Sequence, residues 1–494
     1  MPDAFRLLLI ADIHSATRDA PEANRRCRLG RELLRRALDD ARLRGGFDAV
    51  ALLGDLLDDG TRDDADALLA GLRAELDAAA PDAPLLVAPG NHDGDPDRLL
   101  RALGARAGLH ELASRDGVAY RFAVFADPYV EAKYCTRPGE TMAWTQTLRD
   151  GDAPLVAVQH NPLSPLIEAD YPYMHANRDE IVLGYERAGV SLSVSGHYHA
   201  GQALNRVGGV QYFTAPALCE PPFRYAMLSL RGREVSAEVR SLAAPSEANL
   251  WDCHAHTEFA YCAQDVTADA VIERARTFGL GGVCLVEHAP QLYCAREKFW
   301  DGRHVVEPAL WRKGADARMP RFREAILPKR GEFVHVGLEV ELDADGALTI
   351  RDEDRDWPHP LVGAIHWLPE DPSGMTEAQF AECFLRTTEK LLANGVDVLA
   401  HPFRVFAWQK RQAPPDLYVP VAEMLAAHGA AAEINFHCNQ PEEEFFVACM
   451  QRGVKISFGS DAHELREAAS FGPHLEMLRR IAPSRDVADL LYRP

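Results

Sequence analysis

The stretch "LLGDLLDDG", residues 52–60, places an apolar strand directly before a glycine and a single carboxylate, Asp55. A charge delivered to the end of a buried strand is costly unless it is solvated, paired or bound to a metal ion. Other expected strand ends in this half of the chain carry similar side chains: Asp12 and His14; Asn91, His92 and Asp93; His160; His197 and His199. Residues i and i+2 of an extended chain face the same side, so Asp12 with His14, and His197 with His199, can each chelate one point. We therefore expect Asp55 to bridge two cations, whose charge neutralises it.

The surrounding sequence alternates apolar runs with stretches of helical period up to about residue 241, which predicts a layered α/β domain. Small and polar residues at 242–249 interrupt this pattern, and we interpret them as a linker. Seven further candidate strands follow, most of them separated by helix-like segments. This alternation of strands and helices predicts a (β/α)7 barrel. The expected fold class is thus α/β, with a layered α/β sandwich over residues 1–245 and a barrel over 246–494.

Composition limits the partners and the compartment. The 494-residue chain has 74 acidic and 53 basic residues, a formal net charge of −21, which disfavours long nucleic acids as partners. Its ten cysteines include no C-x-x-C pair, and no apolar run reaches the roughly 20 residues that cross a bilayer. We expect a cytoplasmic, reduced protein that does not bind membranes; its oligomeric state is open.

The order D-x-H, G-D, G-N-H-D, H, G-H-x-H over about residues 5–240 resembles the calcineurin-like metallophosphoesterase superfamily. The resemblance implies a two-metal centre that polarises a phosphoryl group and activates water for in-line attack. It implies one metal held by Asp12, His14, Asp55 and His199, and a second held by Asp55, Asn91, His160 and His197. His92 would be catalytic, donating to the leaving oxygen or stabilising charge on phosphorus, and Asp93 would hold its other ring nitrogen. The mixed nitrogen and oxygen ligands admit Mn²⁺, Fe, Zn²⁺ or Ni²⁺.

In the C-terminal half, the expected strands also end with histidines and carboxylates. Eight such residues can bind metal: His254, His256, His288, Glu339, His366, His401, Asp461 and His463. Their succession over roughly residues 250–475 resembles the polymerase-and-histidinol-phosphatase (PHP) superfamily. The resemblance implies a distorted seven-stranded barrel and a cluster of two or three metals, such as Mn, Fe or Zn, that hydrolyses phosphate esters.

One departure from that superfamily concerns the third metal. Many trinuclear members have another histidine a few residues after the H-x-H, where this chain offers Glu258, Cys262 and Asp265. The cluster is therefore either dinuclear or recruits an acidic residue. For substrate phosphate we expect contacts from three basic residues: Arg296, Lys298 and Arg404.

Together these features predict a bifunctional phosphohydrolase. The N-terminal domain would open a phosphodiester and the C-terminal domain would hydrolyse a phosphomonoester, on a small phosphorylated metabolite or a cyclic nucleotide. A nuclease or DNA-repair enzyme is the alternative, which the acidic charge and the lack of a long Lys/Arg-rich run disfavour. A non-catalytic interaction protein with a dead site would lack ligands, yet every expected metal position of the first domain, and His92, is present.

Overall fold

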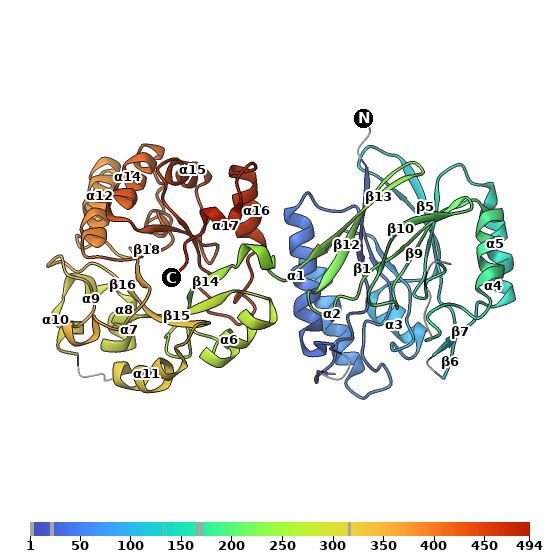
Figure 1. Cartoon of the computed structure of the whole chain (residues 1–494), viewed down its shortest axis with the longest axis horizontal. Coiled ribbons are helices and arrows are strands. Elements are labelled where there is room, and N and C mark those ends of the chain that lie inside the picture. The colour runs from blue at the N-terminus through green and yellow to red at the C-terminus, as the bar shows by residue number, and fades with distance from the viewer. Residues whose placement is uncertain (1–3, 20–23, 132, 165–166, 168–170, 315–317) are drawn as a thin grey trace. The chain divides into compact units, whose positions relative to one another are not determined.

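The computed structural model describes residues 4–19, 24–131, 133–164, 167, 171–314 and 318–494. The chain divides into two compact units, Met1–Leu242 and Ala243–Pro494, both of mixed α/β structure (Figure 1). Within the described ranges, no helix is both long enough and apolar enough to cross a membrane.

The N-terminal unit contains two large sheets. The first, in the order β13-β12-β1-β2-β3, comprises β13 (Glu234–Ser241), β12 (Arg224–Arg231), β1 (Phe5–Ile10), β2 (Ala49–Leu52) and β3 (Leu85–Val87). The second, in the order β10-β11-β9-β8-β5-β4, comprises β10 (Gln202–Val207), β11 (Val210–Thr214), β9 (Val190–Ser195), β8 (Leu155–Val158), β5 (Ala119–Val124) and β4 (Gly108–Ala113). A short hairpin, β6 (Tyr129–Val130) and β7 (Tyr134–Cys135), forms a separate sheet.

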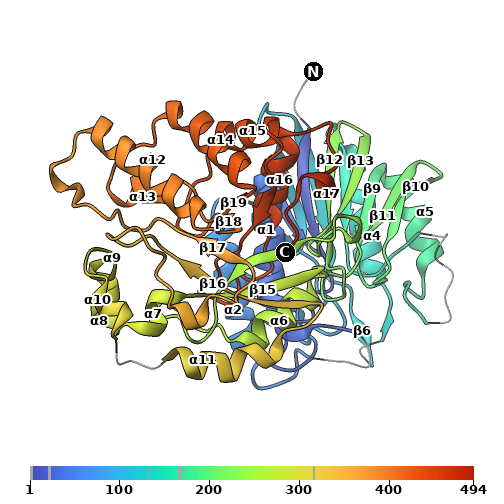
Figure 2. The ribbon, with the colours of Figure 1, turned by 60° about the vertical axis from the view of Figure 1, so that its left-hand side comes forward.

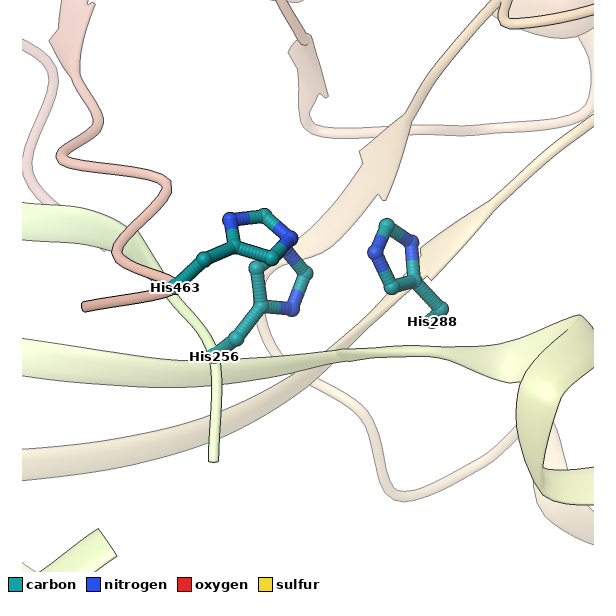
Figure 3. Close-up of side chains that lie close together, drawn as sticks. All are labelled: His256, His288 and His463. Atoms are coloured by element: carbon teal, nitrogen blue, oxygen red, sulfur yellow. The ribbon is translucent and has the colours of Figure 1, made fainter. Parts of the chain in front are cut away.

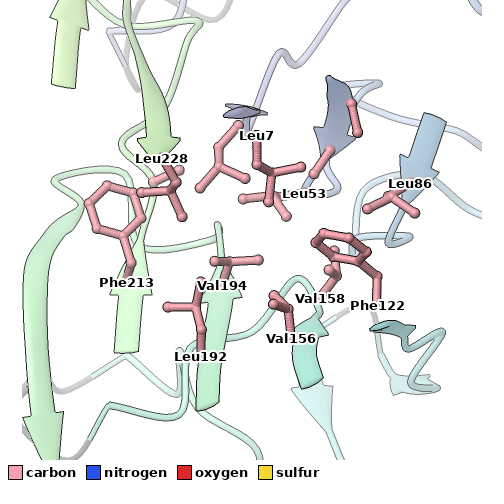
Figure 4. Close-up of a cluster of buried hydrophobic side chains, with 14 of the residues drawn as sticks. Leu7, Leu53, Leu86, Phe122, Val156, Val158, Leu192, Val194, Phe213 and Leu228 are labelled. Carbon is pink, nitrogen blue, oxygen red and sulfur yellow. The ribbon is translucent and has the colours of Figure 1, made fainter. Parts of the chain in front are cut away.

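Apolar side chains from both large sheets meet in one core (Figure 4). Leu7 and Leu53, at the first sheet, share this cluster with Phe122, Val158 and Val194 of the second. The alternate residues Leu8 and Ile10 of β1 point to the opposite face, because successive side chains of a strand alternate, and they are also fully buried. A strand that is buried on both faces has apolar residues at successive positions. This explains the apolar sequence "FRLLLI" of β1.

Helices cover the outer faces of the two sheets (Figure 1). Beside the first sheet lie α1 (Gly30–Leu43), α2 (Ala65–Ala79) and α3 (Pro96–Leu103). Beside the second lie α4 (Gly139–Thr147) and α5 (Arg178–Ala188), whose apolar residues Ile181 and Tyr185 pack against the sheet residues Leu155 and Val190. The N-terminal unit is therefore a sandwich of two sheets between helical layers.

The C-terminal unit is built on one seven-stranded sheet whose paired neighbours are all parallel and follow chain order. Its strands are β14 (Trp251–Ala255), β15 (Gly282–His288), β16 (Val334–Val340), β17 (Leu361–Gly363), β18 (Val398–Leu399), β19 (Ala431–Ile434) and β20 (Ile456–Phe458). A parallel bridge between Ala255 and Ala462 joins the end of the first strand to the segment after the last. The sheet is thus a nearly closed parallel barrel, compatible with the expected (β/α)7 architecture (Figure 2).

The barrel strands are connected mainly by helices. These are α6 (Ala268–Thr277), α7 (Ala289–Tyr293), α8 (Arg296–Trp300), α9 (Arg303–Val306), α10 (Ala309–Arg312), α11 (Arg318–Ile326), α12 (Glu377–Ala393), α13 (Arg404–Trp408), α14 (Tyr418–His428), α15 (Glu443–Gln451), α16 (Gly472–Ile481) and α17 (Val487–Leu490). The longest, α12, begins with a capping box between Thr376 and Gln379. Its buried residues Phe380, Phe384 and Leu391 recur at helical spacing and form the stripe that faces the core.

Candidate metal centres

Strands of both large sheets of the N-terminal unit end close together, and the residues that follow them carry polar side chains. Asp12 and His14 follow β1, Asp55 follows β2, and His160 follows β8. Backbone hydrogen bonds from Asp12 N to Gly54 O (3.1 Å) and from His14 N to Asp55 O (2.9 Å) continue the pairing of β1 and β2 into these loops. The ends of adjacent strands therefore hold the candidate ligands in register.

Four candidate ligands have a backbone conformation that non-glycine residues rarely adopt. The φ angles are 54° at Asp12, 47° at His14, 51° at Asp55 and 65° at His197. Positive φ costs about 1 kcal/mol or more for a residue with a side chain, and such strain gathers at functional sites.

Two glycines allow backbone and ligands to approach closely. A Cβ atom on Gly54 would lie 2.4 Å from Nδ1 of His160, and one on Gly90 would lie 2.3 Å from Oδ1 of Asp55. Gly54 also has a φ of +88°, which glycine alone adopts without strain. The glycines next to Asp55 and Asn91 are thus required by the crowding at this site.

The side chains form two groups that share Asp55. The candidate donor atoms of Asp12, His14 and His199 lie within 4.8 Å of one another, as do those of Asp55, His160 and His197. Oδ2 of Asp55 is 3.7 Å from Nε2 of His14 and 3.3 Å from Nε2 of His160, so it stands between the groups. Asn91 Oδ1 lies 3.3 Å from His160 Nε2. The predicted first-domain ligands therefore come together in the arrangement that a bridging carboxylate would give.

Hydrogen bonds behind the site orient the histidine rings. Glu220 holds Nδ1 of His199 at 2.6 Å, Asp58 holds Nδ1 of His14 at 3.2 Å, and the Leu53 carbonyl accepts from Nδ1 of His160 at 2.6 Å. Such outer partners fix which ring nitrogen keeps its lone pair for a metal. The sequence analysis missed Asp58 and Glu220, although Asp58 lies three residues after Asp55 in the stretch 52–60.

Electrostatics also fit a bound cation. Burial, to which the neighbouring Asp55 charge adds, raises the pKa of Asp12 to about 6. Burial lowers the pKa of His14 to about 4, so its ring is neutral at pH 7, and Nε2 makes no hydrogen bond among the described residues. Neutral imidazole and crowded carboxylates are the donors that a divalent transition metal accepts. The residues present therefore fit a two-metal centre.

His92 and Asp93 differ from expectation. Nδ1 of His92 donates to the backbone carbonyl of Asp58 at 2.6 Å, and not to the Asp93 carboxylate. Asp93 instead accepts backbone N–H groups from Leu56, Leu57 and Gly90 at 2.7, 3.0 and 2.8 Å. These backbone N–H groups occupy both oxygens of the buried Asp93 carboxylate, so neither oxygen binds the His92 ring. Asp93 therefore positions the loops and does not hold the His92 ring.

The second unit gathers its candidate ligands around Glu339, on β16. His401 Nε2 lies 3.1 Å and His366 Nε2 lies 3.6 Å from Oε1 of Glu339. Oε2 lies beside Nδ1 of His288 and 3.7 Å from Nε2 of His254. One buried carboxylate thus stands among four histidines, as Asp55 does in the first unit.

Two further carboxylates, which the sequence analysis did not identify, hold these rings. Glu433 accepts from Nδ1 of His254 at 2.9 Å and from the His401 backbone N–H at 2.8 Å. Glu341 contacts Nδ1 of His366 at 3.1 Å and also Nε2 of His304, which is fully buried. Glu433 is far in the chain from its histidine partners and has no spacing that marks it, whereas Glu341 follows Glu339 by two residues and could have been found by that spacing.

Asp461 and His463 complete the second cluster. Asp461 has a φ of 49°, its backbone N–H donates to His254 O at 2.7 Å, and its Oδ1 is 2.9 Å from Nε2 of His256. Figure 3 shows His256, His288 and His463 close together, and each offers a donor atom within 4.8 Å of the other two. All eight predicted ligands of this half lie in one buried cluster.

The three basic residues expected to contact phosphate lie in different settings. Arg404 is buried, and its Nη2 atom donates to Asp461 Oδ2 at 2.8 Å and to Asn435 Oδ1 at 2.9 Å. These contacts make Arg404 a residue that positions Asp461. Arg296 and Lys298 are exposed on α8, whose Phe299 packs against the ring of His288 with centroids 5.6 Å apart. Phosphate contact by these residues stays a prediction.

Comparison with known proteins identifies the first unit. Residues 5–201 match the family described as calcineurin-like phosphoesterase, and no curated protein matches the chain. A dimetal phosphatase from Danio rerio is 19% identical, with 49% of this chain and 99% of that chain covered and a TM-score of 0.40. GAP50, the anchor in the inner membrane complex of Plasmodium, is 12% identical, with 49% and 85% covered and a TM-score of 0.34. The Thermotoga maritima protein TM1076 is 17% identical, with 48% and 99% covered and a TM-score of 0.24.

The family match, and not these partial likenesses, defines the class of protein. Residues 5–201 form a calcineurin-like metallophosphoesterase domain, as the motif order predicted, and the protein is a metal-dependent phosphoesterase. The match ends at residue 201, so the PHP resemblance of the C-terminal half stays a prediction.

Proposed function

We propose that the protein is a bifunctional phosphohydrolase in which the N-terminal unit opens a phosphodiester and the C-terminal unit hydrolyses a phosphomonoester. The observation that carries this proposal is that each unit has its own cluster of buried histidines around one carboxylate, Asp55 or Glu339. Every candidate ligand of a cluster belongs to the same unit. Two independent centres in one chain favour two hydrolytic steps.

In the first centre, Asp12, His14, Asp55 and His199 would hold one metal, and Asp55, Asn91, His160 and His197 the other. Two divalent ions, from among Mn, Fe, Zn and Ni, would supply Lewis-acid polarisation of the phosphoryl group and an activated water. His92 would serve the leaving group: its Nδ1–H donates to Asp58 O at 2.6 Å, so Nε2 is the ring nitrogen left to act on the leaving oxygen. His92 is partly exposed, as contact with substrate requires, and so is His199.

The second centre would hold two or three Mn, Fe or Zn ions on the eight residues around Glu339. We propose a PHP-type monoesterase site, with Arg296 and Lys298 near enough in the chain to His288 to meet an anionic substrate at the mouth of the barrel. The substrate class is a small phosphorylated metabolite or a cyclic nucleotide. The net charge of −21 disfavours a long nucleic acid as substrate.

The test is a set of phosphorylated metabolites and cyclic nucleotides assayed with enzyme loaded with Mn²⁺, Fe²⁺ or Zn²⁺. Inorganic phosphate and the opened diester are measured separately, in the wild type, Asp55→Asn and His256→Ala. We expect His256→Ala to open the diester and accumulate the monoester, and Asp55→Asn to hydrolyse added monoester normally. If Asp55→Asn stops monoester hydrolysis while His256→Ala does not, the first unit catalyses monoester hydrolysis and the proposal fails.

A further inference from the structure

Three tyrosines lie together beside the ring of His197, a candidate ligand of the first centre. The ring centroid of Tyr173 is 5.3 Å from that of His197, and the centroid of Tyr171 is 5.9 Å from it. Tyr171 and Tyr173 pack on each other with their centroids 4.7 Å apart. Tyr198, the residue after His197, lies 5.2 Å from Tyr173 with the ring planes at 77°. Tyr171, Tyr173 and Tyr198 thus form a tyrosine patch at the edge of the centre.

Hydrogen bonds hold the tyrosine patch in place. Nδ2 of Asn161, the residue after the candidate ligand His160, donates to Tyr173 O at 2.8 Å. The Tyr129 hydroxyl in turn donates to Oδ1 of Asn161 at 2.5 Å. The backbone N–H of Tyr173 donates to Tyr171 O at 2.8 Å, so these two tyrosines share one tight turn. The segment that carries His160 therefore also sets the position of the patch.

Solvent reaches the tyrosine patch, whereas the core tyrosines of the same unit are closed off. Tyr171 is 39% exposed, and Tyr173 and Tyr198 are partly exposed. Tyr120 and Tyr185 are 1% exposed, and their hydroxyl groups donate to Leu230 O and to Gln159 Oε1. Packing of the core accounts for rings of that second kind, but not for exposed rings beside candidate metal ligands.

A positive charge lies at the outer side of the patch. Nζ of Lys133 is 5.3 Å from the ring centroid of Tyr171, within the range of a cation–π contact. Lys133 is the only lysine among residues 1–242, in a chain whose net charge is −21. An aromatic surface with an ammonium group beside it suits a ligand that is both planar and anionic.

From this arrangement we infer that the tyrosine patch binds a planar heteroaromatic ring of the substrate, so that the diester opened by the first centre is a cyclic nucleotide and not an aliphatic metabolite. A phosphoryl group at the metals places its ester substituents beside the ligand rings, and the rings that border His197 are tyrosines. Every nucleobase has a face that stacks on aromatic side chains. The inference rests on the proposed diester opening and names the substrate class of that site.

The experiment measures binding and needs no turnover. The full-length protein, loaded with Mn²⁺, is titrated by calorimetry with adenosine 5′-monophosphate and with ribose 5-phosphate, which lacks the base. Stacking of one base is worth about 5- to 100-fold in affinity, and we expect the wild type to prefer the nucleotide by that factor. Tyr171→Leu and Tyr173→Leu should lose most of this preference and keep the affinity for ribose 5-phosphate, because leucine is apolar but has no ring face. Sites in the C-terminal unit are common to all variants, so the difference reports the first centre.

Two further variants serve as controls. Tyr173→Phe keeps the ring and should keep the preference, which separates stacking from the hydroxyl group and from a folding defect. Leu183→Ala removes an exposed apolar side chain of α5 in the same unit and should match the wild type. Metal content is measured on every variant, because Tyr173 packs on His197.

The outcomes separate this inference from the proposed function. A wild type that binds both ligands equally, or binds neither, overturns the inference, and so does a preference that survives in both leucine variants or is lost in Tyr173→Phe. Diester opening without any preference for the base would leave the bifunctional proposal standing and the tyrosine patch without its ligand. A preference that is lost only in the leucine variants upholds the ring site even if no diester is opened, and in that case the bifunctional proposal fails.

Discussion

Nε2 of His14 lies 3.7 Å from Oδ2 of Asp55, and both side chains are buried. This distance is too long for a hydrogen bond, and His14 Nε2 makes none with any described residue. Two donor atoms bound at about 2.1 Å to one metal stand roughly 3 to 3.5 Å apart, close to the observed spacing. Because the same oxygen is 3.3 Å from His160, Asp55 lies where it can serve two ions at once.

Asp55→Asn should lower the metal content of the first centre and abolish diester hydrolysis. A neutral amide offers one weaker oxygen and cannot bridge two dications. Elemental analysis of purified protein and a diester assay measure the two effects. Asp63→Asn, which removes an exposed carboxylate nearby, is the control and should change neither. Full metal occupancy in Asp55→Asn would show that this carboxylate is not a ligand.

His92→Ala should keep both metals of the first centre and lose about 10²- to 10⁴-fold in the rate of diester hydrolysis. The reason is that its Nδ1 is held by the Asp58 carbonyl and that, in the proposed mechanism, the ring donates to substrate and binds no metal. Metal content and turnover are measured on the same preparation, with His110→Ala as a control away from the strand ends. Loss of metal in His92→Ala would make His92 a ligand.

The sequence predicted which side chains come together at the two candidate centres, because their spacing and neighbours carry the information. Asp12 and His14, or His254 and His256, lie two residues apart on strands, and that separation alone directs both side chains to one point. Glycines 54 and 90, where a Cβ atom would clash, belong to the motifs G-D and G-N-H-D, so the motifs contain the residues that the crowding requires. The N-terminal domain class followed from these features.

What the sequence did not reveal are the groups that hold the ligands. Glu433 lies 179 residues from His254 and Glu220 lies 21 residues from His199, and no local pattern connects the members of either pair. Such contacts depend on tertiary packing, which brings strand ends together only after folding. The expected Asp93–His92 contact was wrong for the same reason, since three backbone N–H groups from two loops occupy the Asp93 carboxylate.

Asp127→Asn should destabilise the N-terminal unit by about 3–5 kcal/mol, because it leaves a buried guanidinium without its counter-charge. Asp127 accepts from Nε (2.9 Å) and Nη2 (2.7 Å) of Arg137 and from Nε2 of His175 (2.9 Å), and all three side chains are buried. Urea unfolding of the first unit measures the loss. Asp66→Asn breaks an ion pair with Arg98 in which the carboxylate is 79% exposed, and it should cost less than about 1 kcal/mol. Equal effects of the two variants would refute the role given to burial.

The stability of the C-terminal unit should depend on pH through His474, on α16. Nε2 of this buried ring donates to Gly459 O at 3.1 Å, in the loop that leads to Asp461, and Phe436, Phe458 and Phe471 surround it. Burial lowers the pKa of His474 from 6.5 to about 4, so folding favours the neutral ring. Its contribution to stability is therefore complete above pH 6.5 and is lost as the pH falls toward 4. At 1.36 kcal/mol per pH unit, the loss between pH 8 and pH 5 is about 2 kcal/mol.

The measurement compares the wild type with His474→Gln, whose amide N–H can reach Gly459 O but does not titrate in this range. Denaturant unfolding of the C-terminal unit is followed at pH 8 and pH 5. The wild type should lose about 2 kcal/mol more than the variant over this interval, because all other titrating groups, including the candidate ligands, are common to both proteins. His428→Gln removes a partly exposed histidine paired with Glu389 and should keep the wild-type dependence on pH. If the wild type and His474→Gln lose the same free energy, His474 is not the group that couples folding of this unit to pH.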